Sequence, residues 1–179
     1  MDTNQRVVIT KRMLREGLLH LLGTKELDKI SITELCRESG VNRSTFYRYY
    51  TLPKDILTEM QNLFMEEIYN SFQGSMSVCD VEHLFGYLLE NREIVKIFLQ
   101  YDSELEWLDL FNHFYQRFVV KKSFKAFQGL DEDSSRLLFS YIAGGTYFIV
   151  HQWIMEDIPK SPKEIADIIM NVMDKEKSF

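Results

Sequence analysis

The sequence predicts an all-α protein in which an N-terminal three-helix helix-turn-helix domain is joined to a larger C-terminal helical bundle. Apolar residues recur at helical spacing along most of the 179-residue chain. Two S-x-x-E capping boxes, at residues 31–34 and 161–164, mark helix starts. No segment shows the alternation of a half-buried strand. We therefore expect two helical domains, residues 1–55 and 56–179.

The N-terminal domain begins with an amphipathic helix that Gly23 ends. Its apolar face is expected to hold Ile9, Met13, Leu14, Leu18, Leu21 and Leu22. A second helix, about 32–39, starts at the capping box of Ser31 and turns Leu35 and Cys36 inward. Gly40 then supplies a tight turn, and Asn42 caps a third helix over about 43–49. Two short helices joined by such a turn make a helix-turn-helix.

The C-terminal domain is expected to be helical as well. One long helix, about 53–72, starts with a proline in its first turn. Further helices are expected at about 80–90, 92–101, 104–127, 133–156 and 162–175. The last has a well-marked start, with Pro162 at its first position. Within the helix before it, Gly144 and Gly145 are expected to allow a close helix crossing at a subunit interface.

Charge is distributed unevenly along the chain, whose net charge is −6. Residues 1–55 contain ten Lys and Arg against seven Asp and Glu, whereas residues 56–179 contain eleven against twenty. A mildly basic N-terminal part on an acidic body favours binding of a polyanion by one end only.

Several classes of protein are disfavoured by the sequence. No apolar run approaches the ~20 residues that span a bilayer, and the first residues lack the apolar segment of a signal peptide. We expect a cytoplasmic protein with no membrane partner. Cys36 and Cys79 are far apart and have no metal-site spacing, and Asp109 with His113 is interpreted as a surface pair. No metal, cofactor or catalytic set is expected, so the chain is predicted not to be an enzyme.

The segment GVNRSTFYRYY, residues 40–50, has two different faces when placed on a helix. Phe46, Tyr49 and Tyr50 cluster toward the core, while Ser44, Tyr47 and Arg48 point the other way. An arginine, a tyrosine and hydroxyl groups suit phosphate oxygens and base edges in a major groove. The alternative is a solvated helix face with an incidental tyrosine.

These residues resemble the helix-turn-helix of the TetR family of bacterial transcriptional regulators, approximately T-x-x-x-I-A-x-x-A-G-V-S-x-x-T-x-Y-x-Y-F. The similarity covers about residues 8–60, and the matching positions are Ser31, Leu35, Cys36, Ser39, Gly40, Val41, Asn42, Thr45, Tyr47, Tyr49 and Tyr50. The stretch YIAGGTYFIVHQWIMEDIPKSPKEIADII also resembles the last two helices of one branch of that family.

The resemblance implies a homodimer that pairs through about residues 134–175 and binds a double-stranded, palindromic DNA operator. It assigns DNA contact to Thr33, Arg43, Ser44, Thr45, Tyr47 and Arg48. It also implies an effector pocket in the aromatic-rich body. This sequence has Pro53 where the family commonly has Lys, so it stays open whether Lys54 contacts phosphate. Tyr49 also stays open, because the resemblance places it near phosphate and helical spacing places it at the edge of the core.

Three functional hypotheses follow. The first is a sequence-specific, ligand-responsive repressor. The second is a TetR-like regulator whose control comes from a protein partner that docks on the body. The third, a helical enzyme, has no catalytic constellation in the sequence to support it. The sequence does not identify the operator or the effector, and it does not distinguish repression from activation.

Overall fold

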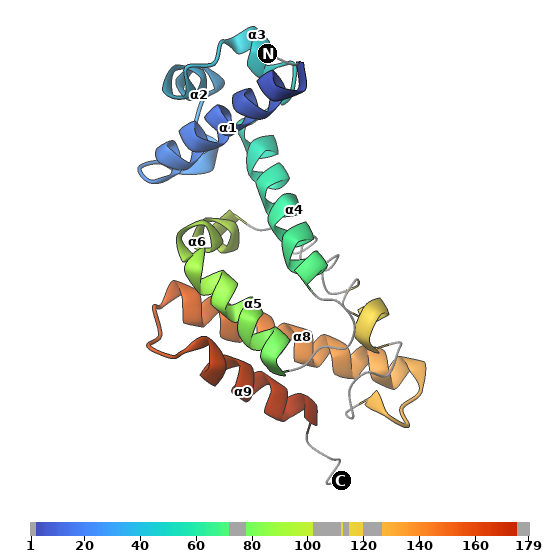
Figure 1. Cartoon of the computed structure of the whole chain (residues 1–179). Helices are drawn as coiled ribbons and strands as arrows, with labels where there is room; N and C mark the ends of the chain where they lie inside the picture. Colours follow the sequence, from blue (N-terminus) through green and yellow to red (C-terminus); the bar gives the residue numbers. More distant parts are fainter. Residues whose placement is uncertain (1–2, 72–77, 102–111, 113–114, 120–126, 175–179) are drawn as a thin grey trace. The chain divides into compact units, whose positions relative to one another are not determined.

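The computed structural model describes residues 3–71, 78–101, 112, 115–119 and 127–174. These residues form helices and turns with no strand among them, which confirms the predicted all-α class. The chain divides into two compact units, Met1–Glu67 and Ile68–Phe179 (Figure 1).

The first unit contains the predicted three-helix arrangement and the start of a fourth helix. In chain order its elements are α1 (Thr3–Leu22), a 3-10 turn η1 (Leu27–Lys29), α2 (Ile32–Ser39), α3 (Arg43–Phe46) and α4 (Pro53–Ser71, of which the residues up to Glu67 belong here). The core takes fully buried side chains from every α-helix, namely Leu14, Leu18, Leu35, Phe46, Ile56 and Leu57. Met13, expected on the apolar face of α1, lies at its exposed edge.

Helices α1 and α2 approach each other closely at Gly17. A Cβ added there would lie 2.9 Å from the Cβ of Ser39 and 3.1 Å from its Cα and backbone nitrogen. Ser39 is buried, and its hydroxyl donates to the carbonyl oxygen of Leu35 at 2.8 Å. The contact therefore has backbone on both sides and no room for a methyl group.

The first unit extends past residue 55, where the sequence suggested a boundary. Ile56, Leu57 and Met60 of α4 are buried. Glu59 of the same helix pairs with Arg15 of α1 at 3.1 Å. The first two turns of α4 thus belong to the same core as α1 because both an apolar and a charged contact hold them there.

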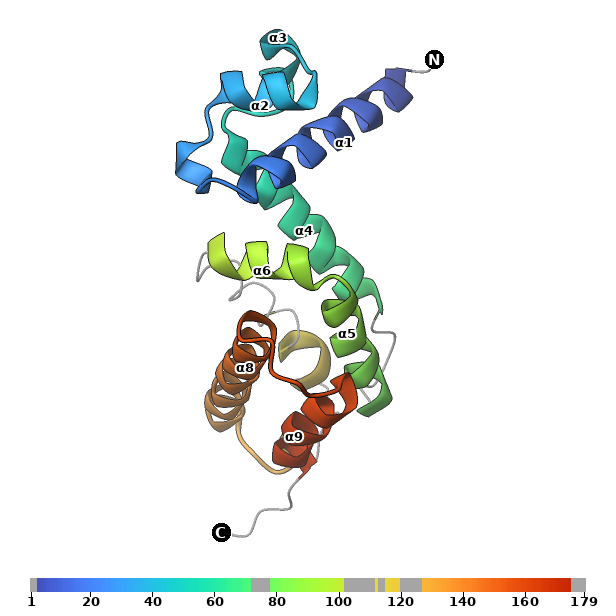
Figure 2. The same cartoon turned by 90° about the vertical axis from the view of Figure 1, so that its left-hand side faces the viewer.

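The second unit is a helical bundle. Its described elements are α5 (Val78–Glu90), α6 (Arg92–Tyr101), a π-helical turn η2 (Tyr115–Val119), α8 (Glu132–Met155) and α9 (Pro162–Asp174). Helix α5 packs on α9, and α8 packs on α6, η2 and α9 (Figure 2). In the core, the rings of Phe85 and Trp153 meet edge to face at 6.1 Å.

Four of the expected body helices are confirmed to within a few residues. The capping box before α9 is complete, since Glu164 accepts from the Ser161 amide at 2.8 Å and the Ser161 hydroxyl accepts from the Glu164 amide at 3.3 Å. Of the helix expected at 104–127, the five-residue turn η2 is π-helical, and most of the remainder lies outside the described residues.

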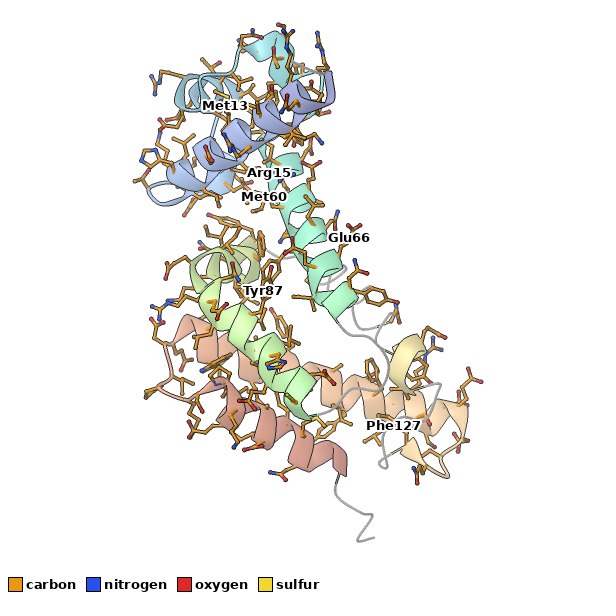
Figure 3. All side chains as sticks on the ribbon, in the orientation of Figure 1. Met13, Arg15, Met60, Glu66, Tyr87 and Phe127 are labelled. Carbon is orange, nitrogen blue, oxygen red and sulfur yellow. The ribbon has the colours of Figure 1, made fainter. Side chains whose placement is uncertain are left out.

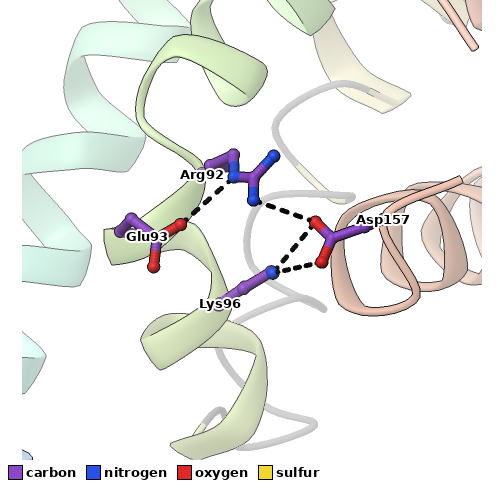
Figure 4. A network of polar contacts seen from close by, with 4 residues as sticks. All are labelled: Arg92, Glu93, Lys96 and Asp157. Carbon is purple, nitrogen blue, oxygen red and sulfur yellow. Dashed lines mark hydrogen bonds and ion pairs between the residues drawn. The ribbon is translucent and has the colours of Figure 1, made fainter. Parts of the chain in front are cut away.

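A polar network ties α6 to the turn after α8 (Figure 4). The carboxylate of Asp157 accepts from Lys96 at 3.0 Å and from Arg92 at 3.2 Å. Asp157 has a φ of 49°, a left-handed conformation that aspartate tolerates better than most residues. Its hydrogen bond with Lys96, which is the main cause, and the charge of Arg92 lower the pKa of Asp157.

Candidate nucleic-acid interface

Local capping at Ser31, Gly40 and Asn42 sets the ends of α2 and the start of α3. The Ser31 hydroxyl accepts from the Glu34 amide at 3.2 Å and starts α2. Gly40 ends α2 at φ 68° and ψ 14°, a left-handed geometry that favours glycine. The Asn42 side chain then accepts from the Thr45 amide at 2.8 Å and starts α3. The predicted helix-turn-helix is present, and each predicted cap is made.

Helix α3 is shorter than the 43–49 span that the sequence suggested. It is α-helical only over Arg43–Phe46. Beyond it, the Arg48 and Tyr49 amides donate to carbonyls three residues back, at 3.3 Å and 2.9 Å. The chain tightens there into a 3-10-like turn, and the Tyr50 amide donates to the Phe46 carbonyl, four residues back, at 3.0 Å.

Most of the sequence-predicted contact residues lie at the surface of this segment. Thr33, Arg43, Ser44, Tyr47 and Arg48 are exposed, and Thr45 is half-buried. The Ser44 hydroxyl donates to the Asn42 side chain at 2.8 Å, which leaves its oxygen free to accept. The exposed set therefore combines cationic and neutral hydrogen-bonding groups around a turn that its own caps hold.

Arg43 and Tyr47 form a pair on the exposed side of this turn. The Arg43 guanidinium carbon lies 6.0 Å from the Tyr47 ring centroid, and Nη2 donates to the tyrosine hydroxyl at 3.5 Å. Tyr47 is 52% exposed, a large fraction for an aromatic side chain. The hydrogen bond to Tyr47 is the main cause that raises the pKa of the Arg43 guanidinium. The i,i+4 spacing of the two residues makes this pairing accessible, but the exposed face of the segment did not by itself predict it.

The opposite side of the turn rests on an aromatic core. Phe46 is fully buried, with its ring 6.1 Å from Tyr50 and 5.5 Å from Tyr47. Tyr50 is buried and donates its hydroxyl to Glu59. Tyr49 is half-buried, so it lies at the edge between the two faces. The inward placement of Phe46 and Tyr50 confirms the face expected from helical spacing.

The start of α4 is occupied by one of its own side chains. The Asp55 carboxylate accepts from the Thr51 and Leu52 amides at 2.7 Å and 2.8 Å. Pro53 has no amide hydrogen to offer. Lys54 is exposed beside these groups. The backbone donors of Thr51 and Leu52 are therefore already in use.

The described residues contain neither a metal site nor a membrane-spanning helix. Among the described side chains, no three His, Cys, Asp or Glu residues gather closely enough to bind a metal ion, and Asp109 and His113 lie outside that part of the chain. Within the same ranges, no helix has the length and apolar character needed to cross a membrane.

Helix α8 carries an exposed apolar stripe, defined here as Leu137, Tyr141, Phe148 and Met155. The first three are 73%, 72% and 66% exposed. Their spacing of four, seven and seven residues places them along one face of the helix. Gly144 and Gly145 lie between Tyr141 and Phe148, and a Cβ added at either meets no atom within 4 Å. No described residue thus covers this face of α8.

A TetR family model described as "Transcriptional regulator C-terminal region" matches residues 80–175, more than half of the chain. The chain belongs to the TetR family of transcriptional regulators. The match covers most of the second unit, so it is independent of the helix-turn-helix resemblance in the first. No curated protein matches the sequence.

The TetR fold is also found in solved structures. The crystal structure of a TetR transcriptional regulator from Streptococcus agalactiae 2603V superposes with a TM-score of 0.74 at 14% identity, over 96% of this chain and 97% of the other. The dihydroxyacetone kinase operon activator DhaS superposes with a TM-score of 0.65 at 17% identity, over 93% and 94%. At such low identity these likenesses establish the fold alone.

Proposed function

We propose that this TetR family protein is a sequence-specific DNA-binding regulator that acts as a homodimer on a palindromic operator. The observation that carries the proposal is the exposed Arg43–Tyr47 pair, presented on a capped turn above a fully buried Phe46. Cationic and aromatic side chains held on a rigid support are suited to contacting the bases and phosphates of DNA.

The exposed residues divide by their chemistry. Arg43 is the base reader, because a guanidinium bonds two acceptors of one guanine at once. Tyr47 and the half-buried Thr45 offer single neutral groups, which fit phosphate oxygens better than a unique base pattern. The remaining members of the proposed interface are Thr33, Ser44 and Arg48.

Dimerisation is proposed through about residues 134–175. One short recognition segment contacts only a few base pairs, so two copies are needed for useful specificity. The exposed stripe on α8 supplies a surface for the second copy, since contiguous apolar side chains of this size are rarely left in water. The open space over Gly144 and Gly145 gives room for a partner helix to approach closely.

The direction of control is proposed as ligand-responsive repression, in a cytoplasmic protein without a cofactor or catalytic activity. Control by a protein partner is the alternative. DhaS has the same fold and is named as an operon activator, so whether this protein represses or activates has to be measured. A reporter gene placed behind the bound DNA, in cells with and without the protein, distinguishes repression from activation.

The DNA-binding proposal is tested by gel shift against DNA flanking the protein's own gene, followed by a series of operator variants at several salt concentrations. Arg43→Ala is expected to relax discrimination at one position in each half-site. Tyr47→Phe is expected to weaken all operators alike, by about 1 kcal/mol per half-site, with little change in salt slope. If Arg43→Ala instead lowers affinity uniformly with a shallower salt slope, Arg43 is a backbone anchor and base reading belongs to another exposed residue.

The dimer is tested by sedimentation at micromolar concentration. The wild type is expected to be dimeric and Phe148→Glu monomeric, because the substitution places a charge in the middle of the stripe. Gln100→Glu, at an exposed position of α6, adds the same charge on another helix and is expected to remain dimeric. A monomeric wild type would refute the proposed assembly.

A further inference from the structure

Three hydrogen-bond donors converge on one carboxylate in the first unit. Glu59 of α4 accepts from Lys11 and, at 3.1 Å, from Arg15, both on α1, and also from the Tyr50 hydroxyl. The side chains of Lys11, Arg15 and Glu59 are each a little under one-third exposed. This part-buried group, Lys11, Arg15, Tyr50 and Glu59, is called the Glu59 cluster below.

The Glu59 cluster is connected to the buried side of the recognition segment, defined here as residues 43–50. Tyr50 contacts Glu59 through its hydroxyl and faces Phe46 through its ring, at a centroid distance of 6.1 Å. The Lys11 ammonium nitrogen lies 5.4 Å from the centroid of the same ring. Tyr50 is therefore held by a carboxylate at one point and by a cation at another, three residues beyond the exposed Tyr47.

Glu59 supplies the negative charge that balances the two cations of this cluster. Without its negative charge, two cations of α1 would face each other's repulsion in a part-buried site. The Tyr50 hydroxyl, on a buried side chain, would exchange a charged acceptor for a weaker neutral one. Apolar packing around Phe46 would remain. Loss of the carboxylate would therefore shift the end of the recognition segment more than it would disturb the core.

We propose that Glu59 is a positioning residue for operator recognition: through Tyr50 it fixes the end of the recognition segment to α1 and α4 without touching DNA. This inference rests on the proposed DNA-binding function. The one-turn helix α3 is too short to hold its own direction, so its orientation depends on side chains that anchor the segment to the rest of the unit. The fully buried Phe46 is one anchor, and Tyr50 with Glu59 is the anchor at the end, whereas the Asn42 cap bonds only residues of the same segment.

A positioning role has a consequence that a purely structural role lacks. Reading a base by two hydrogen bonds requires placement to within a fraction of an ångström, whereas non-specific binding depends on the number of cations near phosphate. Misplacing the segment therefore lowers operator affinity and leaves non-specific affinity almost unchanged. The diagnostic quantity is the ratio of the two affinities, measured well below the melting temperature.

The test compares Glu59→Gln with a matched control, Glu66→Gln. Both substitutions remove one negative charge from α4, but Glu66 is exposed, and Figure 3 labels it farther along the helix than Met60. Each full-length variant is titrated with operator DNA and with a scrambled duplex of equal length. We expect Glu59→Gln to lower the ratio of operator to scrambled affinity about tenfold, and Glu66→Gln to leave it as in the wild type.

Tyr50→Phe supplies a second route to the same answer, since it removes only the hydroxyl that Glu59 accepts. We expect it to lower the ratio severalfold, and we expect the double variant with Glu59→Gln to lose less than the sum of the two single variants. Ratios for Glu59→Gln and Tyr50→Phe equal to that of Glu66→Gln would overturn the inference. A wild type with no preference for operator would instead refute the proposed function.

Discussion

Replacing Gly17 by alanine separates helix propensity from tertiary packing, because the two predict opposite signs. Gly17 lies inside α1, where alanine is the better helix former by about 1 kcal/mol. An added Cβ, however, would stand 2.9 Å from the Ser39 Cβ and 3.1 Å from its Cα and nitrogen. Ordinary contacts between such atoms begin near 3.5 Å.

The size of the effect follows from which atoms are in the way. Two of the three close atoms are backbone atoms of α2, so no side-chain rotation relieves the overlap and the two helices must separate. Overpacking of this kind costs about 1–3 kcal/mol, and the backbone position favours the upper half of that range. After subtraction of the propensity gain, we expect a net loss of about 1–2 kcal/mol, or roughly 5–10 °C in the melting of the first unit.

The assay is calorimetry of the full-length protein, with Gly86→Ala as the control. Gly86 lies inside α5, and a Cβ added there meets no atom within 4 Å, so alanine should stabilise by about 0.5–1 kcal/mol. The two substitutions are chemically identical and are expected to shift melting in opposite directions. A Gly17→Ala protein that melts at or above the wild-type temperature would show that the α1–α2 contact does not limit the packing.

Three further outcomes are expected. Phe46→Ala should lower the free energy of unfolding by about 3–5 kcal/mol in denaturant titrations, because it removes a fully buried ring; wild-type stability would place the ring elsewhere. Burial raises the pKa of Glu59, but the hydrogen bonds from Lys11, Tyr50 and Arg15 together outweigh burial and lower the pKa to about 2. The stabilisation that the Glu59 carboxylate gives the fold should therefore be complete above about pH 4.5 and disappear as pH falls toward 2. Glu59→Gln should therefore flatten the acid side of the stability profile, and an unchanged profile would contradict this. Asp157→Asn keeps a side chain that tolerates a positive φ but loses the ionic contacts, so it should lower the melting temperature at low salt and have little effect at high salt.

Local sequence determined the helices and their ends. The Ser31 and Ser161 caps and the glycine at position 40 act over three or four residues, so their geometry is specified by nearby side chains alone. Helical spacing likewise placed Phe46 and Tyr50 inward, because a single helix face is a property of one segment. The TetR resemblance rested on the same local pattern.

Tertiary structure decided the features that join residues far apart in the chain. Glu59 contacts Lys11 and Arg15 across intervals of 48 and 44 residues, and neither segment has a local pattern that predicts the contact. Gly17 occupies an ordinary helix position in the sequence, and only the packing of α2 against α1 makes it a close contact. The end of α3 at Phe46 is likewise not marked by any residue of the local pattern. Propensity, caps and amphipathic faces act within a few residues, whereas ion pairs and close backbone approaches depend on how helices are packed, which a one-dimensional pattern does not contain.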